Sequence, residues 1–274
     1  MTPSGGYAEV IGDPIDHSKS PAIHRFWLAK LKLDLDYRAS RVSRAELPAF
    51  LKQRRTDATW RGCNVTMPLK LDALMRADGA SDLAVTAGAA NILVPKDGAL
   101  LAGNTDIGGI LKLLGPLLKE RGDDGGITLL GNGGAARAVL VALHMIGVTG
   151  VRIQARDLSA AYKLAVEFGL GEQPTTFDRP VDSAGLINAT PLGMASAPPL
   201  AIDIAAMPAK DGWVFDMITE PVETPLLRLA RQRGLTTVDG IAMLVEQAAD
   251  SFHLLFGQDA PRQYDPELMT RLRS

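Results

Sequence analysis

Lys70 and Asp106 are two charged residues whose types suit proton transfer. An alternating apolar and polar segment through residues 64–66 predicts a strand, and Pro68 then indicates the first position of a helix. Lys70 therefore falls in the first turn of that helix, where the helix dipole repels a cation. A lysine in this position either extends its ammonium group to water or is kept there for its chemistry.

Asp106 begins a second helical pattern, with apolar residues at positions 107, 110, 111 and 114. Aspartate commonly caps a helix by accepting a hydrogen bond from a free backbone N–H. Alternatively, its carboxylate lies beside Lys70 and forms a proton-transfer pair. The spacing of the two residues along the chain does not favour one interpretation over the other.

Ser20 and Pro21 predict another helix start, because serine caps free N–H groups and proline suits the first helical position. Ser18 and Ser20 could together bind a carboxylate at this helix N-terminus. The alternative is that Ser20 is only a cap and Ser18 only a turn residue. His17 and His24 are expected in the loop and on the helix surface, without a role in metal binding.

A glycine-rich turn follows a short apolar strand predicted at residues 127–130. Gly131, Gly133 and Ala136 form the pattern G-x-G-x-x-A at the start of a helix. In this context glycines let the backbone approach a pyrophosphate, and the helix N-terminus binds its charge. The order of strand, turn and helix predicts a dinucleotide-binding turn.

The next predicted strand, VRIQA, ends at Arg156 and Asp157, about 20 residues after Ala136. Folds of this kind contact the adenosine ribose near this position. Arg156 favours a 2′-phosphate and hence NADP, whereas Asp157 favours the free hydroxyls of NAD. The two residues give a mixed signal, so NADP and NAD both stay open at this point.

Short apolar runs alternate with helical patterns along most of the chain, which predicts an α/β fold with a largely parallel sheet. The residues 96–98, Lys-Asp-Gly, indicate a hairpin between two short strands, and residues 190–199 indicate a surface loop. Near the C-terminus, Gln247 lies beside the buried stripe of a helix that includes Ile241, Val245 and Phe252.

The composition limits the classes of protein to which the chain can belong. Its 274 residues allow one large domain or two smaller ones. Lys and Arg total 29 against 31 Asp and Glu, which argues against a nucleic-acid partner. No apolar run reaches the roughly 18 residues of a membrane span, and the N-terminus lacks a signal-peptide pattern. We therefore expect a cytoplasmic protein without a membrane partner. Cys63 is the one cysteine, and no spacing of His, Cys and carboxylates resembles a metal-ligand set, so no metal is expected.

Together these segments resemble the shikimate dehydrogenase family along nearly the whole chain. The matching blocks occur in the family's order: GDPIDHSKSP, GCNVTMPLK, AGAAN, GNTD, GNGGAARA, INATPLGM, FDMITEP and DGIAMLVEQA. The resemblance implies two α/β domains: a substrate-binding and catalytic domain at 1–105 and 241–274, and a Rossmann-like NADP-binding domain at 106–240. The C-terminal helices would return to the first domain. It also implies an NADPH-dependent oxidoreductase that reduces 3-dehydroshikimate to shikimate for aromatic amino-acid biosynthesis, as a monomer or homodimer.

The resemblance further implies roles for individual residues. Lys70 and Asp106 would be the catalytic pair. The substrate would be bound by Ser18, Ser20, Asn64, Thr66, Asn91, Asp106, Gln247 and Thr219, the last at a position where the family usually has tyrosine. The cofactor would be bound by Gly131, Asn132, Gly133, Gly134, Ala135, Arg156, Met217 and Gly240.

Two other functions stay open. A related enzyme that acts on quinate or a related cyclohexene carboxylate, using NAD, is kept open by Asp157 and Thr219. A non-catalytic sensor of a pathway metabolite would be expected to lack Lys70 or Asp106, and the chain has both.

Overall fold

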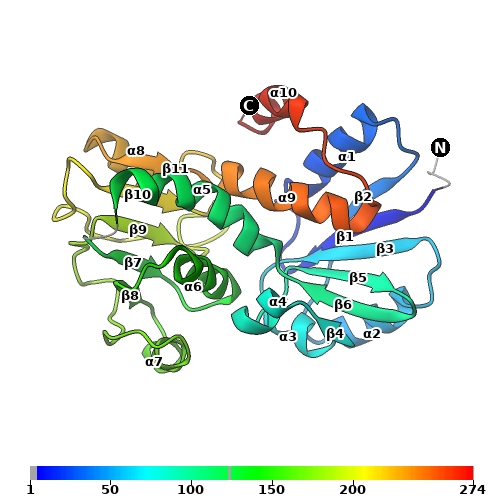
Figure 1. Ribbon diagram of the computed structural model, residues 1–274, viewed down its shortest axis with the longest axis horizontal. Helices are drawn as coiled ribbons and strands as arrows, with labels where there is room; N and C mark the ends of the chain where they lie inside the picture. Colours follow the sequence, from blue (N-terminus) through cyan, green and yellow to red (C-terminus); the bar gives the residue numbers. More distant parts are fainter. Residues whose placement is uncertain (1–4, 123–124, 274) are drawn as a thin grey trace. The chain divides into compact units, whose positions relative to one another are not determined.

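The computed structural model describes residues 5–122 and 125–273, which form two compact units. The first unit runs to Gly108 and resumes at Val245, and the second comprises Gly109–Leu244 (Figure 1). Two helices, α5 (Thr105–Arg121) and α9 (Gly240–Phe256), have residues in both units. Within the described ranges, no helix is long and apolar enough to cross a membrane.

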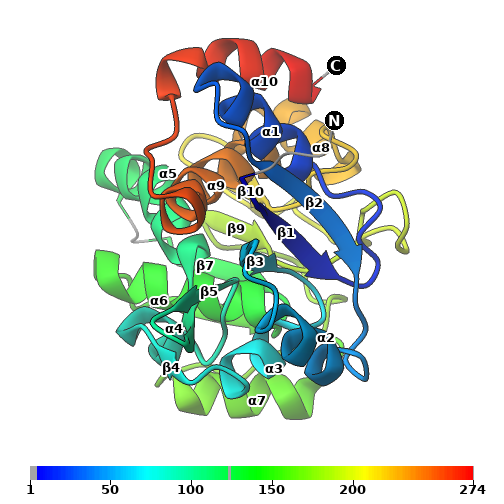
Figure 2. The same cartoon turned by 90° about the vertical axis from the view of Figure 1, so that its right-hand side faces the viewer.

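The first unit contains a mixed sheet in the order β2-β1-β3-β5-β6-β4. Strands β2, β1 and β3 are parallel, whereas β5 is antiparallel to β3 and β6. Helix α1 lies on one face of the sheet, and α2 and α3 lie on the other (Figures 1 and 2). Its elements are β1 (Tyr7–Gly12), α1 (Ser20–Lys30), β2 (Asp36–Arg41), α2 (Leu47–Arg54), β3 (Trp60–Val65), α3 (Lys70–Met75), β4 (Gly79–Ala80), α4 (Asp82–Ala87), β5 (Ile92–Lys96), β6 (Ala99–Gly103), the 3-10 helix η1 (Arg262–Tyr264) and α10 (Asp265–Arg273).

The predicted hairpin is confirmed between β5 and β6. Its two connecting residues, Asp97 and Gly98, have φ angles of 50° and 80°. Two-residue hairpins favour positive φ at both positions because this backbone twist matches that of the flanking strands. The hairpin leads the chain from β5 through β6 to the start of α5, where Asp106 lies.

His24 is fully buried in the first unit, so the prediction that it lies on the helix surface is wrong. Its ring stacks on Tyr37 with 4.0 Å between centroids and an angle of 3° between planes, and it also packs against Phe252 of α9. On α1 the buried residues include Ser20, Ile23, His24 and Trp27, the spacing of one helical face. The sequence pattern did not indicate this position, because histidine is polar and is usually expected on the exposed face of a helix. Burial lowers its pKa to about 3, so the imidazole is neutral near pH 7.

The second unit contains a parallel sheet in the order β11-β10-β9-β7-β8. Helices α6 and α7 lie on one face and α8 on the other (Figure 1). Its elements are β7 (Ile127–Leu130), α6 (Gly134–Ile146), β8 (Val151–Gln154), α7 (Leu158–Glu167), β9 (Gly185–Asn188), β10 (Trp213–Asp216), α8 (Pro225–Gln232) and β11 (Thr236–Val238). The α/β prediction is confirmed, and residues 190–199 contain neither helix nor strand, as expected.

The order of these strands reverses direction at β7. The chain passes from β7 to its neighbour β8 on one side, and β9 then pairs with β7 on the other. Ligands of open parallel sheets bind outside the carboxyl ends of the strands at such a switch point. Gly131 directly follows β7, so the predicted dinucleotide-binding turn lies at this edge of the sheet.

Candidate active site

Lys70 and Asp106 form an ion pair in the first unit. The Lys70 Nζ and Asp106 Oδ2 atoms are 2.5 Å apart, and the two side chains are only 15% and 8% exposed. Lys70 is the first residue of α3, so the prediction that it lies in the first helical turn is confirmed. The prediction that Pro68 is the first helical residue is wrong, because Pro68 lies in the turn before the helix. The carboxylate offsets the unfavourable position of the ammonium group at a helix N-terminus.

The position of Asp106 decides between the two interpretations of this residue. It is the second residue of α5, and its backbone N–H donates to the side-chain oxygen of Asn104 at 3.2 Å. That bond is typical of a capping residue, so Asn104 takes the role considered for Asp106. The Asp106 carboxylate instead accepts from Lys70 through Oδ2 and from Asn91 Nδ2 through Oδ1, the latter at 2.9 Å.

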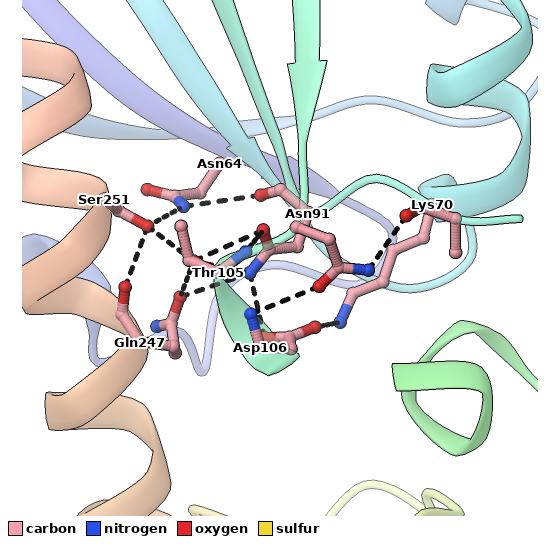
Figure 3. A network of polar contacts seen from close by, with 9 residues as sticks. Asn64, Lys70, Asn91, Thr105, Asp106, Gln247 and Ser251 are labelled. Atoms are coloured by element: carbon pink, nitrogen blue, oxygen red, sulfur yellow. Dashed lines mark hydrogen bonds and ion pairs between the residues drawn. The ribbon is translucent and has the colours of Figure 1, made fainter. Parts of the chain in front are cut away.

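Polar side chains from several elements surround this ion pair (Figure 3). Asn91 Nδ2 also donates to Thr105 Oγ1 at 2.9 Å, and the Thr105 backbone N–H donates to Asn91 Oδ1 at 2.7 Å. The Gln247 Oε1 atom lies 3.4 Å from Asn91 Nδ2 and 3.3 Å from Thr105 Oγ1. The structure therefore brings together four of the predicted residues, Lys70, Asn91, Asp106 and Gln247.

Asn64, the last but one residue of β3, joins the cluster through Ser251. Its Nδ2 atom donates to Ser251 Oγ at 2.8 Å, and its Oδ1 atom accepts from the Tyr37 hydroxyl at 2.7 Å. The Ser251 and Thr105 hydroxyl oxygens are 2.9 Å apart. Sequence reasoning missed these three hydroxyl residues. Thr105 adjoins Asp106, and Ser251 lies one helical turn after Gln247, whereas no local pattern indicates Tyr37.

Three other predicted substrate residues follow the carboxyl ends of β1 and β3. Ser20 is buried as the first residue of α1, but Lys19 occupies the N-cap position and no side chain caps the helix, so the prediction that Ser20 is the cap is wrong. Ser18 Oγ instead accepts from the Ser20 backbone N–H at 3.4 Å. Thr66 lies just after β3, and a Cβ at Gly12 would come within 2.5 Å of its Cγ2 atom. Among the described residues, no side-chain hydrogen bond joins these hydroxyls to the Lys70–Asp106 cluster.

In the second unit, the glycine turn is shaped by two different requirements. Gly131 has a φ angle of +105°, and a Cβ there would lie 2.9 Å from Thr190 Cγ2. Gly133 is the N-cap of α6 with a φ angle of −89°, and a Cβ there would meet no atom within 4 Å. Gly134 and Ala135 begin the helix, whose first N–H groups have no partners within it. The open space before these donors suits a pyrophosphate.

Arg156 and Asp157 differ in what their side chains do. Arg156 is exposed, whereas the Asp157 carboxylate caps α7 by accepting from the Ala160 backbone N–H at 3.0 Å. Asn132 Nδ2 donates to the Asp157 carbonyl oxygen at 3.3 Å, so the glycine turn and these residues lie together. The cap gives Asp157 a structural role that does not depend on a ribose.

Met217 and Thr219 belong to a segment that the buried Asp216 holds in place. Asp216 Oδ1 accepts from Asn188 Nδ2 at 3.0 Å and from the Ile218 N–H at 3.3 Å, and Oδ2 accepts from the Thr224 hydroxyl at 2.6 Å. Burial raises the pKa of Asp216.

Gly240, the first residue of α9, packs against the same segment, since a Cβ there would collide with the Ile218 carbonyl oxygen. The structure therefore brings together Met217, Thr219 and Gly240, all within the second unit.

Comparison with known proteins gives two family matches. Residues 10–93 match the shikimate dehydrogenase substrate binding domain, and residues 240–265 match the shikimate 5′-dehydrogenase C-terminal domain. The NADP(+) shikimate dehydrogenase of Sphingopyxis alaskensis is 44% identical over 268 residues, which cover 97% of this chain and 96% of that protein.

Solved structures of similar fold include enzymes with either cofactor. Shikimate 5-dehydrogenase of Thermus thermophilus, in complex with NADP(H) and shikimate, is 35% identical with a TM-score of 0.81, covering 97% of this chain and 99% of that chain. Quinate dehydrogenase of Corynebacterium glutamicum, in complex with NAD, is 29% identical with a TM-score of 0.83 and the same coverage of 97% and 99%.

Proposed function

The chain belongs to the shikimate dehydrogenase family of oxidoreductases, and we propose that it catalyses the reversible NADPH-dependent reduction of 3-dehydroshikimate to shikimate in aromatic amino-acid biosynthesis. The observation that carries the proposal is the buried Lys70–Asp106 ion pair, 2.5 Å between Nζ and Oδ2, with Asn91 and Gln247 beside it. A glycine turn at the start of α6 supports the use of a dinucleotide.

Lys70 and Asp106 carry the proton chemistry in this proposal. When bound, NADPH supplies the hydride that attacks the C3 carbonyl carbon of the substrate. As negative charge grows on the carbonyl oxygen, the Lys70 ammonium group donates a hydrogen bond and then its proton, which leaves a hydroxyl group and a neutral amine. Asp106 holds the Lys70 Nζ atom in place, and Lys70 regains a proton from solvent before the next cycle. An arginine would not serve, because it does not release its proton.

The other polar side chains of the first unit would bind the substrate. Ser18, Ser20 and Thr66 suit the carboxylate, because they carry hydroxyl groups at the start of α1 and just after β3. Asn64, Asn91, Asp106 and Gln247 would bind the ring hydroxyls.

The second unit would bind the cofactor. Residues 131–135 would contact the pyrophosphate, and Met217 and Gly240 the nicotinamide end. Arg156 would bind the 2′-phosphate of NADP, since its guanidinium is exposed while the neighbouring carboxylate of Asp157 caps α7. The functional domains would then be 1–105 with 241–274 for substrate and 106–240 for cofactor.

A second candidate function is oxidation of quinate or a related cyclohexene carboxylate with NAD. The similarity to the quinate dehydrogenase of Corynebacterium glutamicum supports it. Thr219 supports it too, because it stands where the shikimate dehydrogenase family usually has a tyrosine. Thr219 would contact the substrate in either case.

The test is to measure absorbance at the nicotinamide band with purified protein. Shikimate and quinate are each offered with NADP+ and with NAD+, and kcat/KM is determined for the four combinations. We expect the highest value for shikimate with NADP+. A higher value for quinate with NAD+ would establish the second candidate, and no turnover in any combination would contradict both.

We also propose that the enzyme is cytoplasmic, acts as a monomer or homodimer, and has no nucleic-acid or membrane partner. Size-exclusion chromatography with light scattering measures the oligomeric state, and cell fractionation measures the location. A tetramer, or recovery with membranes, would contradict this part of the proposal.

A further inference from the structure

Tyr37 contacts the candidate substrate site without having been predicted as part of it. It lies in β2, fully buried, and its hydroxyl donates to Asn64 Oδ1 at 2.7 Å. Its ring is stacked on His24 at 4.0 Å between centroids. The His24 ring nitrogens have no hydrogen-bond partner in the described part of the chain, so packing alone holds the two rings together.

The orientation of the Asn64 carboxamide follows from the chemistry of its neighbours. Its Nδ2 atom faces the Asn91 carbonyl oxygen at 3.3 Å and Ser251 Oγ at 2.8 Å. A backbone carbonyl can only accept, so the amide nitrogen has to lie on that side and Oδ1 on the side of Tyr37. Both Asn64 N–H groups are therefore used within the protein, and only the oxygen keeps a lone pair for a ligand.

Ser251 links Asn64 to the rest of the cluster. It lies on α9, fully buried, and its hydroxyl donates to the Gln247 carbonyl oxygen at 3.0 Å, a bond to the preceding helical turn that serine often makes. With its hydrogen used there, Ser251 Oγ accepts from Asn64 and from the Thr105 hydroxyl at 2.9 Å.

Thr105 then accepts from Asn91 Nδ2, whose other N–H goes to Asp106 Oδ1, both at 2.9 Å. The hydrogen bonds therefore run without interruption from Tyr37 to the catalytic candidate Asp106 (Figure 3 shows the part from Asn64).

We propose that Tyr37 and Ser251 are positioning residues for substrate binding: they hold the Asn64 carboxamide so that its oxygen accepts from a ring hydroxyl of the substrate. The proposal rests on the proposed function, because it places Asn64 against the substrate. Neither residue touches the reacting atoms. Their loss therefore weakens the binding of shikimate more than it slows the chemical step at Lys70.

Tyr37→Phe tests this proposal by removing one hydroxyl while keeping the ring that stacks on His24. We expect KM for shikimate to rise about 3- to 10-fold, the effect of one net hydrogen bond, with KM for NADP+ unchanged. Tyr7→Phe is the matched control: Tyr7 is also buried, on the adjacent strand β1, but its hydroxyl donates to Asp57 at 2.9 Å. A purely structural role for Tyr37 would lower Tm in both variants and leave KM for shikimate at the wild-type value, which would overturn the proposal.

Ser251→Ala removes the second positioning hydroxyl, and Ser251→Thr restores it. We expect Ser251→Ala to raise KM for shikimate by a similar factor of about 3 to 10 and Ser251→Thr to bring it back toward the wild-type value. Equal KM values in all three proteins would contradict a positioning role.

A measurement without turnover separates this proposal from the proposed function. The side-chain amide resonances of Asn64, assigned with Asn64→Asp, report hydrogen exchange of its N–H groups. We expect slow exchange in the wild-type chain and at least tenfold faster exchange in Tyr37→Phe, whether or not shikimate is the substrate. Unchanged exchange would overturn the proposal, whereas an inactive wild-type chain would overturn only the proposed function.

Discussion

The two candidate binding regions are built in different ways. In the first unit, the site consists of polar side chains from β3, α3, α5, α9 and Asn91 just before β5, which satisfy one another's hydrogen bonds. In the second unit, the turn after β7 consists of backbone, with Gly131 at a φ angle of +105° and the N-terminus of α6. Binding in the first region depends on the functional groups that its side chains carry. Binding in the second region depends on glycines, whose lack of a Cβ lets the backbone take this shape and leaves room for a ligand. Substitutions should therefore affect turnover and substrate binding in one region, and backbone strain and cofactor binding in the other.

Lys70→Ala should have the largest effect. Loss of a general acid lowers kcat by about 10²- to 10⁴-fold, with little change in KM, because the ammonium group acts mainly on charge that develops in the transition state. Asp106→Asn keeps the shape of the side chain and should also lower turnover strongly, and it should lower Tm because the buried Lys70 ammonium group loses its charged partner. Steady-state kinetics and thermal unfolding measure both effects. Lys52→Ala, at an exposed position on α2, is the control. A wild-type kcat in Lys70→Ala would remove this residue from the mechanism.

His24 should make the first unit sensitive to acid. Its pKa is about 3 when folded against 6.5 for a free imidazole, so the unfolded chain binds more protons between these values. The free energy of unfolding should fall as pH drops below about 6.5, by up to roughly 1.4 kcal/mol for each pKa unit of difference. His24→Leu should weaken this dependence, as measured by Tm between pH 7 and pH 4. An unchanged slope of Tm against pH in His24→Leu would contradict the assignment.

Asp216 of the second unit should have the opposite dependence. Burial raises the pKa of Asp216 above its usual 3.8, so the folded chain keeps a proton on this carboxyl at pH values where the unfolded chain has lost it. This difference stabilises the folded chain at low pH, and the stabilisation is lost as pH rises from below 3.8 through the folded pKa. The two units therefore contain buried titratable groups whose effects on stability have opposite signs.

Gly131→Ala and Gly133→Ala should separate strain from cofactor binding. At Gly131 an alanine has both a positive φ and a close approach to Thr190, which costs about 1 to 3 kcal/mol of stability. At Gly133 an alanine meets no protein atom within 4 Å, so Tm should fall less than in Gly131→Ala, by the cost of alanine at an N-cap alone, while its methyl group obstructs the pyrophosphate. Tm and KM for NADP+ are measured for both variants. Equal losses of Tm would contradict the difference between these two glycines.

Asp157→Ser should have the smallest effect. Serine can cap α7 as aspartate does, but it removes a negative charge beside the proposed 2′-phosphate site. We expect the ratio of kcat/KM for NADP+ to that for NAD+ to rise about 2- to 5-fold, because an exposed charge is partly screened. Asp203→Ser is the control, since Asp203 Oδ1 also accepts a backbone N–H, from Ala205 at 2.8 Å. A fall in the ratio would show that Asp157 favours NADP.

Two expectations about α1 failed. The sequence placed His24 on the helix surface because histidine is polar, yet Tyr37 and Phe252 surround it with aromatic rings. It also assigned the cap of α1 to Ser20, whose side chain is buried in the structure. For His24, long-range packing decided what a local pattern could not, because Tyr37 and Phe252 are distant from it in the chain. For Ser20, the helix boundary differs by one residue, since Lys19 takes the N-cap position.

The amino-acid sequence by itself determined the features that depend on neighbouring residues: the α/β pattern, the hairpin at Asp97 and Gly98, and the glycine turn between β7 and α6. These follow from backbone preferences over a few positions. Only the tertiary structure decided that the Asp106 carboxylate meets Lys70 instead of capping α5, and that Tyr37 and Ser251 meet at Asn64. Contacts between side chains this far apart in the sequence depend on how strands and helices pack, and no local spacing encodes that.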